Sequence, residues 1–152
     1  KAIDVLGKND NGFFLTVESG RIDHAHHAGN AYNALNDTIE FANAVQAAID
    51  NTNPEETLIL VTADHSHVFT IAGYPKRGNP SGPVAGRVEL NGVDTTTPGF
   101  HQETTVPLGS ETHAGEDNSL HAKGPGAQLA QGVIEQNVVF HLINQALELT
   151  QQ

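Results

Sequence analysis

The feature of the sequence that most constrains its fold is a strand–helix–strand pattern between residues 13 and 62. Residues 13–17, Phe-Phe-Leu-Thr-Val, are apolar and rich in strand-forming types, and they predict a buried strand. From residue 30 to residue 50, apolar positions recur at three- and four-residue steps, which predicts an amphipathic helix. Residues 57–62 predict a second strand, apolar enough for a parallel sheet. The pattern therefore predicts a right-handed βαβ unit in an α/β fold.

The rest of the chain predicts shorter elements. Residues 1–7 read as the end of a helix, residues 119–122 as a short strand, and a final helix begins near residue 137. Residues 73–104 are rich in Gly, Pro, Asn and Thr and show no sustained period, which predicts an irregular insert with one short strand at 87–90. The 152 residues suffice for one domain or a large piece of one. Because the chain opens on Lys1, we expect a fragment or a processed chain.

The composition excludes several classes of function. Seven Lys and Arg stand against 18 Asp and Glu, and the formal net charge of −11 disfavours binding to nucleic acid through phosphate contacts. No apolar run is long enough to span a bilayer. Cysteine is absent, which excludes disulfides and thiolate chemistry. Nine histidines are the unusual feature of the composition.

Polar residues that can bind metal ions are concentrated in three clusters. They occupy residues 18–27 (Glu-Ser-Gly-Arg-Ile-Asp-His-Ala-His-His), 62–67 (Thr-Ala-Asp-His-Ser-His) and 111–117 (Glu-Thr-His-Ala-Gly-Glu-Asp). The first two clusters directly follow the two predicted strands. Ligands of open α/β sheets bind beyond the carboxyl ends of strands, so we expect both clusters to open onto one edge of the sheet.

Asp23 and His27 are four residues apart, so a helix would place both side chains on one face. A carboxylate and an imidazole suit zinc, and His113 is a candidate third ligand from a distant loop. Three protein ligands leave one coordination position open, which is the pattern of a catalytic zinc. Asp64 and His65 are adjacent, so in a strand their side chains would point to opposite faces. They can bind the same ion only in a turn, and the end of the strand provides one. Glu18 is a hard oxygen donor that suits magnesium.

An ordinary structural role is the simplest interpretation of the remaining histidines, which we expect to be solvated or satisfied by hydrogen bonds. These are His24, His26, His101, His121 and His141. Neither the Asp64–His65 pair nor the Asp23/His27 pair would be a strong signal by itself. The signal is the occurrence of three such clusters in one short chain.

The three clusters, together with residues 122–125 (Ala-Lys-Gly-Pro) and 132–137 (Gly-Val-Ile-Glu-Gln-Asn), closely resemble segments of the alkaline phosphatases. The resemblance covers nearly the whole chain except about residues 78–95. It implies that residues 1–152 are the C-terminal portion of a single alkaline phosphatase-like domain. That domain is part of a three-layer α/β/α sandwich with a mostly parallel central sheet, normally in a homodimer.

The resemblance also implies one metal centre with two zinc ions and one magnesium ion. The first zinc would be held by Asp23, His27 and His113, the second by Asp64 and His65, and the magnesium by Glu18, while His67 would orient Asp23. The implied activity is two-step hydrolysis of phosphate monoesters through a phosphoserine intermediate. A periplasmic or secreted location is implied as well.

Parts of the family pattern are missing from this chain. The Asp-Ser-Ala nucleophile motif does not occur, nor do the aspartate shared by zinc and magnesium, the threonine segment that binds magnesium and the phosphate-clamping arginine. Nothing aligns Ser66, Ser110 or Arg21 with these roles, so no catalytic residue is assigned. We expect the chain alone to be inactive and to require the N-terminal half of the enzyme. The stretch between the second and third clusters is short in comparison with family members that carry a large insert there. We therefore expect residues to be missing near 81–83.

Two alternative functions remain open at this point. Because the nucleophile is absent, the chain could be a catalytically inert metal-binding fragment. The Thr-Ala-Asp-His segment also occurs in other enzymes of the superfamily, including mutases and phosphodiesterases.

Overall fold

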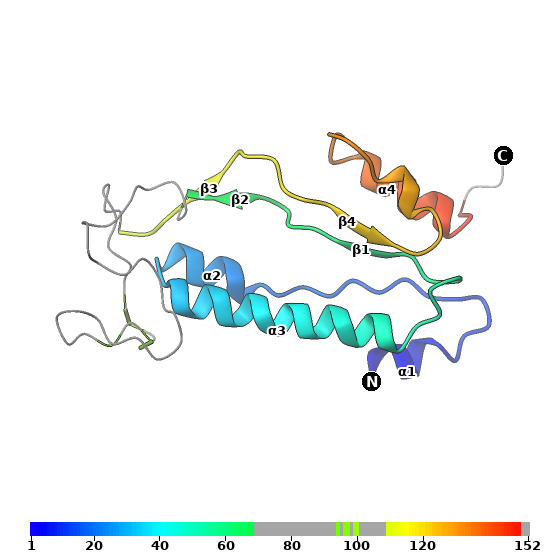
Figure 1. Cartoon of the computed structure of the whole chain (residues 1–152), viewed down its shortest axis with the longest axis horizontal. Helices are drawn as coiled ribbons and strands as arrows, with labels where there is room; N and C mark the ends of the chain where they lie inside the picture. The colour runs from blue at the N-terminus through cyan, green and yellow to red at the C-terminus, as the bar shows by residue number, and fades with distance from the viewer. Residues whose placement is uncertain (69–93, 95, 98, 101–108, 150–152) are drawn as a thin grey trace. The chain divides into compact units, whose positions relative to one another are not determined.

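The computed structural model describes residues 1–68, 94, 96–97, 99–100 and 109–149 (Figure 1). Two compact units make up the chain. The first unit comprises Lys1–Phe14, Ala44–Asp64 and Asn118–Gln152, and the second comprises Leu15–Asn43 and His65–Asp117. The elements in chain order are α1 (Ala2–Leu6), α2 (Arg21–His27), α3 (Ala31–Asp50), β1 (Ile59–Val61), β2 (Ser66–His67), β3 (His113–Ala114), β4 (His121–Lys123), the 3-10 helix η2 (Ala127–Leu129) and α4 (Val138–Ala146).

The first unit contains an antiparallel ladder between β1 and β4, in which Ile59 lies opposite Lys123 and Val61 opposite His121. Directly after β4, Gly124 has a φ of +105°, and a Cβ at this position would lie 2.0 Å from the carbonyl oxygen of Thr57. Both the positive φ and the close approach require glycine. Gly124 therefore allows the chain to turn after β4 while its backbone remains in close contact with Thr57, just before β1.

The second unit contains an antiparallel ladder between β2 and β3, in which Ser66 lies opposite Ala114 and His67 opposite His113. Beyond this pair, the N–H of Val68 donates to the carbonyl of Thr112 at 2.9 Å. The ladder is short, yet it joins the second histidine-rich cluster of the sequence to the third. It thereby decides which side chains of the two clusters meet.

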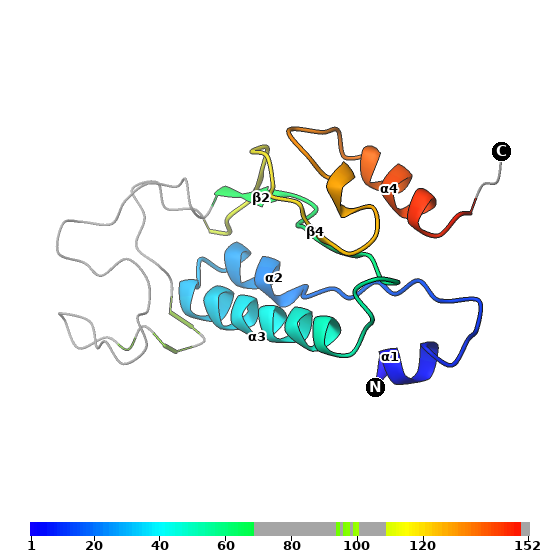
Figure 2. The same cartoon turned by 45° about the vertical axis from the view of Figure 1, so that its right-hand side comes forward.

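The junction between α2 and α3 is organised by Asn30, which is only 1% exposed. Its Oδ1 accepts the N–H of Asn33 at 2.9 Å, which caps the first turn of α3. Its Nδ2 donates to the carbonyls of Thr97 and Phe100, each at 3.1 Å. Asn30 thus ties the start of α3 to a distant loop and lets α2 fold back along α3 (Figures 1 and 2).

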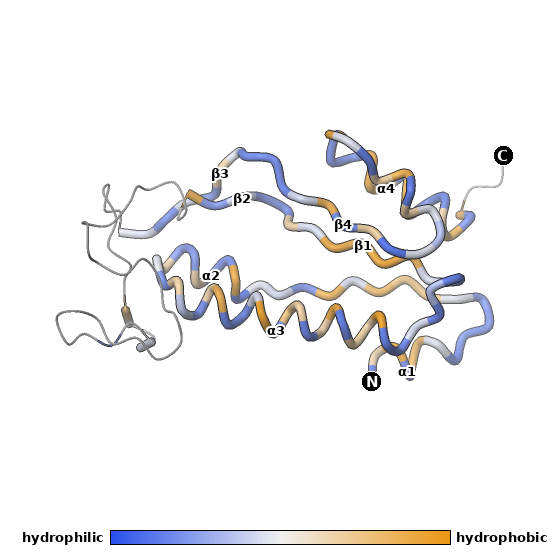
Figure 3. Tube along the Cα trace, viewed as in Figure 1, coloured by the Kyte–Doolittle hydropathy of each residue, from blue (hydrophilic) through white to orange (hydrophobic). Residues whose placement is uncertain are grey.

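Apolar residues recur along α3, as Figure 3 shows. The buried residues of this helix are the small Ala31 and Ala34, whereas Leu35 and Ile39 are 51% and 57% exposed. In α4, Leu142 is buried and Phe140 is 63% exposed. Among the described residues, no helix combines the length and the apolar character needed to cross a membrane.

The structure confirms the long helix, which spans residues 31–50, and the final helix, which spans 138–146. The strands predicted at 57–62 and 119–122 form as β1 and β4, with shifted or narrower bounds. The strand predicted at residues 13–17 is wrong for the described structure, because no described strand pairs with it. Consequently the expected parallel βαβ unit is absent from the described residues, and both ladders there are antiparallel. The strand expected at 87–90 lies outside the described residues, as does most of the insert.

Candidate metal centre

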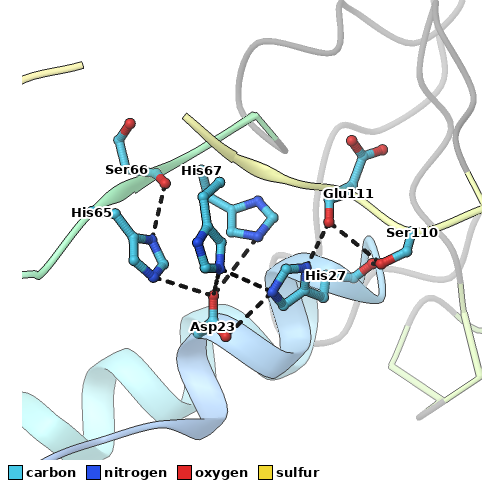
Figure 4. Close-up of polar contacts among 8 residues, drawn as sticks. Asp23, His27, His65, Ser66, His67, Ser110 and Glu111 are labelled. Carbon is cyan, nitrogen blue, oxygen red and sulfur yellow. Dashed lines mark hydrogen bonds and ion pairs between the residues drawn. The ribbon is translucent and has the colours of Figure 1, made fainter. Parts of the chain in front are cut away.

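Helix α2 presents Asp23 and His27 on one face, as their four-residue spacing predicts. Oδ2 of Asp23 lies 3.4 Å from Nε2 of His27 (Figure 4). Neither side chain is fully buried, since their exposed fractions are 34% and 36%. The helix therefore supplies one oxygen donor and one nitrogen donor that are close together and accessible to an ion.

The β2–β3 ladder brings His113 to the same point. Nε2 of His113 lies 3.3 Å from Oδ1 of Asp23 and 3.1 Å from Nε2 of His27. Ligand atoms about 2.0–2.1 Å from a tetrahedral zinc ion are separated from one another by about 3.3 Å. The two histidine nitrogens are thus as close together as zinc ligands are, and each faces a different oxygen of Asp23 at a similar distance.

The ring of His27 is oriented by a contact to the backbone. Its Nδ1 lies 2.6 Å from the carbonyl oxygen of Glu111, and because a carbonyl only accepts, Nδ1 carries the hydrogen. The neutral ring then has its lone pair on Nε2, the atom that faces Asp23 and His113. Metal-binding histidines commonly donate their second nitrogen to a backbone carbonyl in this way. The same segment holds the end of α2, since the N–H of Glu111 donates to the carbonyl of His27 at 2.9 Å.

His67 and His65 complete the group around Asp23. Nε2 of His67 lies 3.8 Å from Oδ1 of Asp23, and Nε2 of His65 lies 3.9 Å from the same oxygen. Nδ1 of His65 faces the carbonyl of Ser66 at 3.1 Å, which leaves Nε2 as the accepting nitrogen. The ring of His65 stacks on that of His113, with centroids 3.5 Å apart and an interplanar angle of 17°.

Burial keeps His67 uncharged. The side chain is 4% exposed, and burial lowers its pKa to about 4, with further lowering by the neighbouring His26 and His27. Burial also lowers the pKa of His26, whose ring centroid lies 5.2 Å from that of His67. At neutral pH, His67 is therefore neutral and adds no positive charge that would repel a metal ion from Asp23.

The carboxylate of Asp23 is the centre of this arrangement. Its Oδ1 is buried and has no hydrogen-bond partner, although imidazole nitrogens surround it at 3.3–3.9 Å. A buried carboxylate oxygen is costly unless a hydrogen bond or a cation compensates it. Ligand atoms of Asp23, His27, His67 and His113 all lie within 4.8 Å of one another. Within this group, Asp23, His27 and His113 offer one oxygen and two nitrogens, a donor set that suits zinc, and His67 lies beside them.

Two predicted ligands are not members of this group. Glu18 is exposed, shortly before α2, and is not part of the group within 4.8 Å. Asp64 is exposed and belongs to the first unit. The structure therefore brings together five of the seven predicted side chains, which are Asp23, His27, His65, His67 and His113.

Among the histidines expected to have ordinary roles, His24 is exposed and His121 faces the Ser119 hydroxyl at 3.1 Å. His141 is exposed beside Phe140, and His101 lies outside the described residues. Sequence reasoning did not anticipate the contact of His26 with His67. The spacing could have indicated it, because His26 follows Asp23 by three residues and a helix places both on the same side.

The contribution of Glu111 was also missed. It acts through backbone atoms, which carry no residue-type signal, so the sequence could not have indicated it.

The family model of the alkaline phosphatases matches this chain over residues 1–90 and 84–149. The tissue-nonspecific alkaline phosphatase of Gallus gallus is 44% identical over 167 residues, covering 92% of this chain and 32% of that protein. The tissue-nonspecific alkaline phosphatase of Homo sapiens is 42% identical over 169 residues, covering 93% of this chain and 32% of that protein. The chain thus spans about a third of the length of the curated relatives it matches.

Proposed function

The chain belongs to the alkaline phosphatase family, and from this membership we propose that it supplies a metal centre for the hydrolysis of phosphate monoesters through a phosphoserine intermediate. The observation that carries the proposal is the convergence of Asp23, His27 and His113: the two Nε2 atoms lie 3.1 Å apart, and each lies 3.3–3.4 Å from one of the two carboxylate oxygens of Asp23. Three protein donors with these separations match a zinc site that keeps one position open for substrate.

We assign Asp23, His27 and His113 to a first zinc ion. Zinc, when bound, supplies a Lewis acid that draws negative charge from the transferring phosphoryl group. The chain's own residues prepare for this in two ways. The Glu111 carbonyl accepts the hydrogen on Nδ1 of His27, so the lone pair on Nε2 is available to bind the metal ion. His67 remains neutral beside Asp23 and orients its carboxylate.

A second zinc ion is assigned to Asp64 and His65, and a magnesium ion to Glu18. The Ser66 carbonyl supports the role of His65, because it binds Nδ1 and leaves Nε2 available. Glu18 and Asp64 are both exposed and offer the oxygen donors that these ions accept.

The nucleophile is proposed to come from outside this chain. The hydroxyl of Ser66 is engaged with Glu116, and that of Ser110 lies 3.3 Å from the carbonyl of His27. Neither hydroxyl is one of the donor groups around Asp23. We propose that the rest of a full-length enzyme, about two thirds of the length of the relatives, provides the serine and the phosphate-binding groups. The three-layer sandwich, the homodimer and a periplasmic or secreted location are proposed on the same basis.

The parent protein that contains this chain tests the proposal. We expect it to hydrolyse a chromogenic phosphate monoester, to lose that activity after thorough chelation and to regain it with zinc and magnesium. His113→Ala should abolish both activity and zinc binding at this centre, whereas His121→Ala, a control in the first unit, should preserve both. Activity that survives complete metal removal would reject the proposal.

Substrate comparison separates the alternative functions. The similarity to tissue-nonspecific alkaline phosphatases favours monoester hydrolysis over mutase or phosphodiesterase activity. The parent protein should therefore prefer monoesters to diesters and should not isomerise phosphoglycerate. This chain alone should bind zinc but form no phosphoserine.

A further inference from the structure

Ser66 lies on β2 between two histidines of the metal centre, and its side chain points away from Asp23 (Figure 4). The hydroxyl of Ser66 donates to Oε2 of Glu116, and it accepts the N–H of Glu116 at 3.1 Å. Glu116 lies two residues after the end of β3 and three residues after His113. One hydroxyl group is thus bound to both the backbone and the side chain of the segment that leaves β3.

This contact bears on the register of the ladder. The β2–β3 ladder places His67 opposite His113, and each strand has only two residues. Such a short antiparallel pair is marginal without further contacts. A slip by one residue would turn the side chains of one strand to the opposite face and carry a histidine away from Asp23.

Two contacts beyond the paired residues hold the register, one at each end. At one end, the N–H of Val68 donates to the carbonyl of Thr112 at 2.9 Å. At the other end are the paired bonds of Ser66 with Glu116. The backbone bond cannot be removed by changing a side chain, but the Ser66–Glu116 bonds can.

We propose that Ser66 and Glu116 form a clasp that positions His113 for metal binding and His67 beside Asp23. The proposal rests on the metal centre proposed above and extends it to two residues that donate no ligand atom. Their role is positioning: the clasp keeps the two strands in the register that sets His113 3.3 Å from the Asp23 carboxylate. The clasp also fixes the position of Ser66, whose backbone carbonyl accepts a hydrogen bond from Nδ1 of His65.

The test compares variants of the full parent protein in two metal measurements. The first is the zinc dissociation constant, determined by competition with a chromophoric chelator. The second is the visible absorption of the cobalt-substituted protein at saturating cobalt, which reports coordination geometry. Loss of folding stability alone would not change the second spectrum, because saturating metal populates the folded form.

We expect Ser66→Ala and Glu116→Ala each to weaken zinc binding about ten-fold, as loss of groups that support metal ligands commonly does, and to alter the cobalt spectrum. The double variant should be no weaker than either single one, because both remove the same clasp. Ser66→Thr and Glu116→Gln retain the hydroxyl and the accepting oxygen, so they should stay close to the parent protein. Asp117→Ala, which removes the exposed carboxylate next to Glu116, is the matched control and should have no effect.

Parent-like affinity and cobalt spectrum in both alanine variants, with zinc binding lost in His113→Ala, would overturn the clasp and leave the metal centre standing. Equal zinc binding by the parent protein and His113→Ala would reject the metal centre itself, and the clasp with it. Should Ser66→Ala fail to fold, the comparison of Glu116→Ala with Glu116→Gln decides the question.

Discussion

The Nε2 atoms of His27 and His113 lie 3.1 Å apart, although the two residues are 86 positions apart in the chain. Because the carbonyl of Glu111 fixes the hydrogen of His27 on Nδ1, the His27 nitrogen in this pair is an acceptor. In the metal-free protein, Nε2 of His27 can accept a hydrogen bond from Nε2 of His113. When metal is bound, both nitrogens can bind the same ion. The pair is therefore the place where metal binding and the fold of the second unit are most directly coupled.

Replacing His27 by Asn separates its two roles. The Asn amide can still donate to the carbonyl of Glu111, but it has no atom at the position of Nε2. We expect stability within about 1 kcal/mol of the parent protein in urea denaturation. Zinc affinity should fall by more than about 100-fold in calorimetric titration, beyond the loss typical of groups that only support a ligand. An unchanged binding isotherm would contradict the assignment of Nε2 as a ligand.

The stability of the metal-free protein should depend on pH through His67, whose pKa in the folded state is lowered to about 4, chiefly by burial. On unfolding, the pKa returns to 6.5, the ordinary value of histidine, so in acid the unfolded state binds the additional proton. The contribution of neutral His67 is fully present above pH 6.5. It is lost as the pH falls toward 4, by about 3 kcal/mol in total.

Urea denaturation of the chelator-treated protein at pH 7 and pH 4.5 measures this dependence, with His67→Gln as the reference that cannot titrate. The parent protein should lose more stability than the Gln variant over this interval. The lowered pKa of His26 acts in the same direction and remains in both proteins. Parallel losses in the two proteins would show that His67 is not the titrating group.

Asn30 should be sensitive to substitution, because its buried side chain forms hydrogen bonds with Asn33, Thr97 and Phe100. Asn30→Ala removes the side-chain donor to the carbonyls of Thr97 and Phe100 and uncaps α3, so we expect a loss of about 2–4 kcal/mol in the free energy of unfolding. Asn30→Asp keeps the capping oxygen but turns a carboxylate toward the two carbonyls. It should destabilise the protein at least as much at neutral pH, and a milder effect would argue against the donor role of Nδ2.

Gly124 and Gly126 provide a matched pair of positions in the turn after β4. Both have positive φ, of +105° and +82°, but only at Gly124 would a Cβ meet backbone, at 2.0 Å from the Thr57 oxygen. Gly126→Ala should cost about 1–2 kcal/mol for its left-handed conformation. Gly124→Ala should cost clearly more, because the β1–β4 contact must also open. Thermal denaturation of the two variants checks the order, and equal shifts would refute it.

Several features follow from the sequence because they depend on local geometry. The apolar spacing between residues 30 and 50 predicts α3, since a helix repeats every 3.6 residues whatever surrounds it. The same geometry predicts that Asp23 and His27 share a face of α2. The choice of His113 as their partner came from residue chemistry and family resemblance. The structure places it beside them, while its role as a zinc ligand stays a prediction.

The long helix α3, the final helix α4 and the family of this chain could be predicted from the sequence, because each depends on residue types at fixed short spacing. The structure was needed to show that His113 stands opposite His67 and that His65 stacks on His113. It also decided that Glu111 orients His27 through its backbone, and that residues 13–17, apolar as a strand should be, pair with no described strand. Strand pairing is set by hydrogen bonds between segments far apart in the chain, and no local pattern specifies which partner or register a segment will adopt.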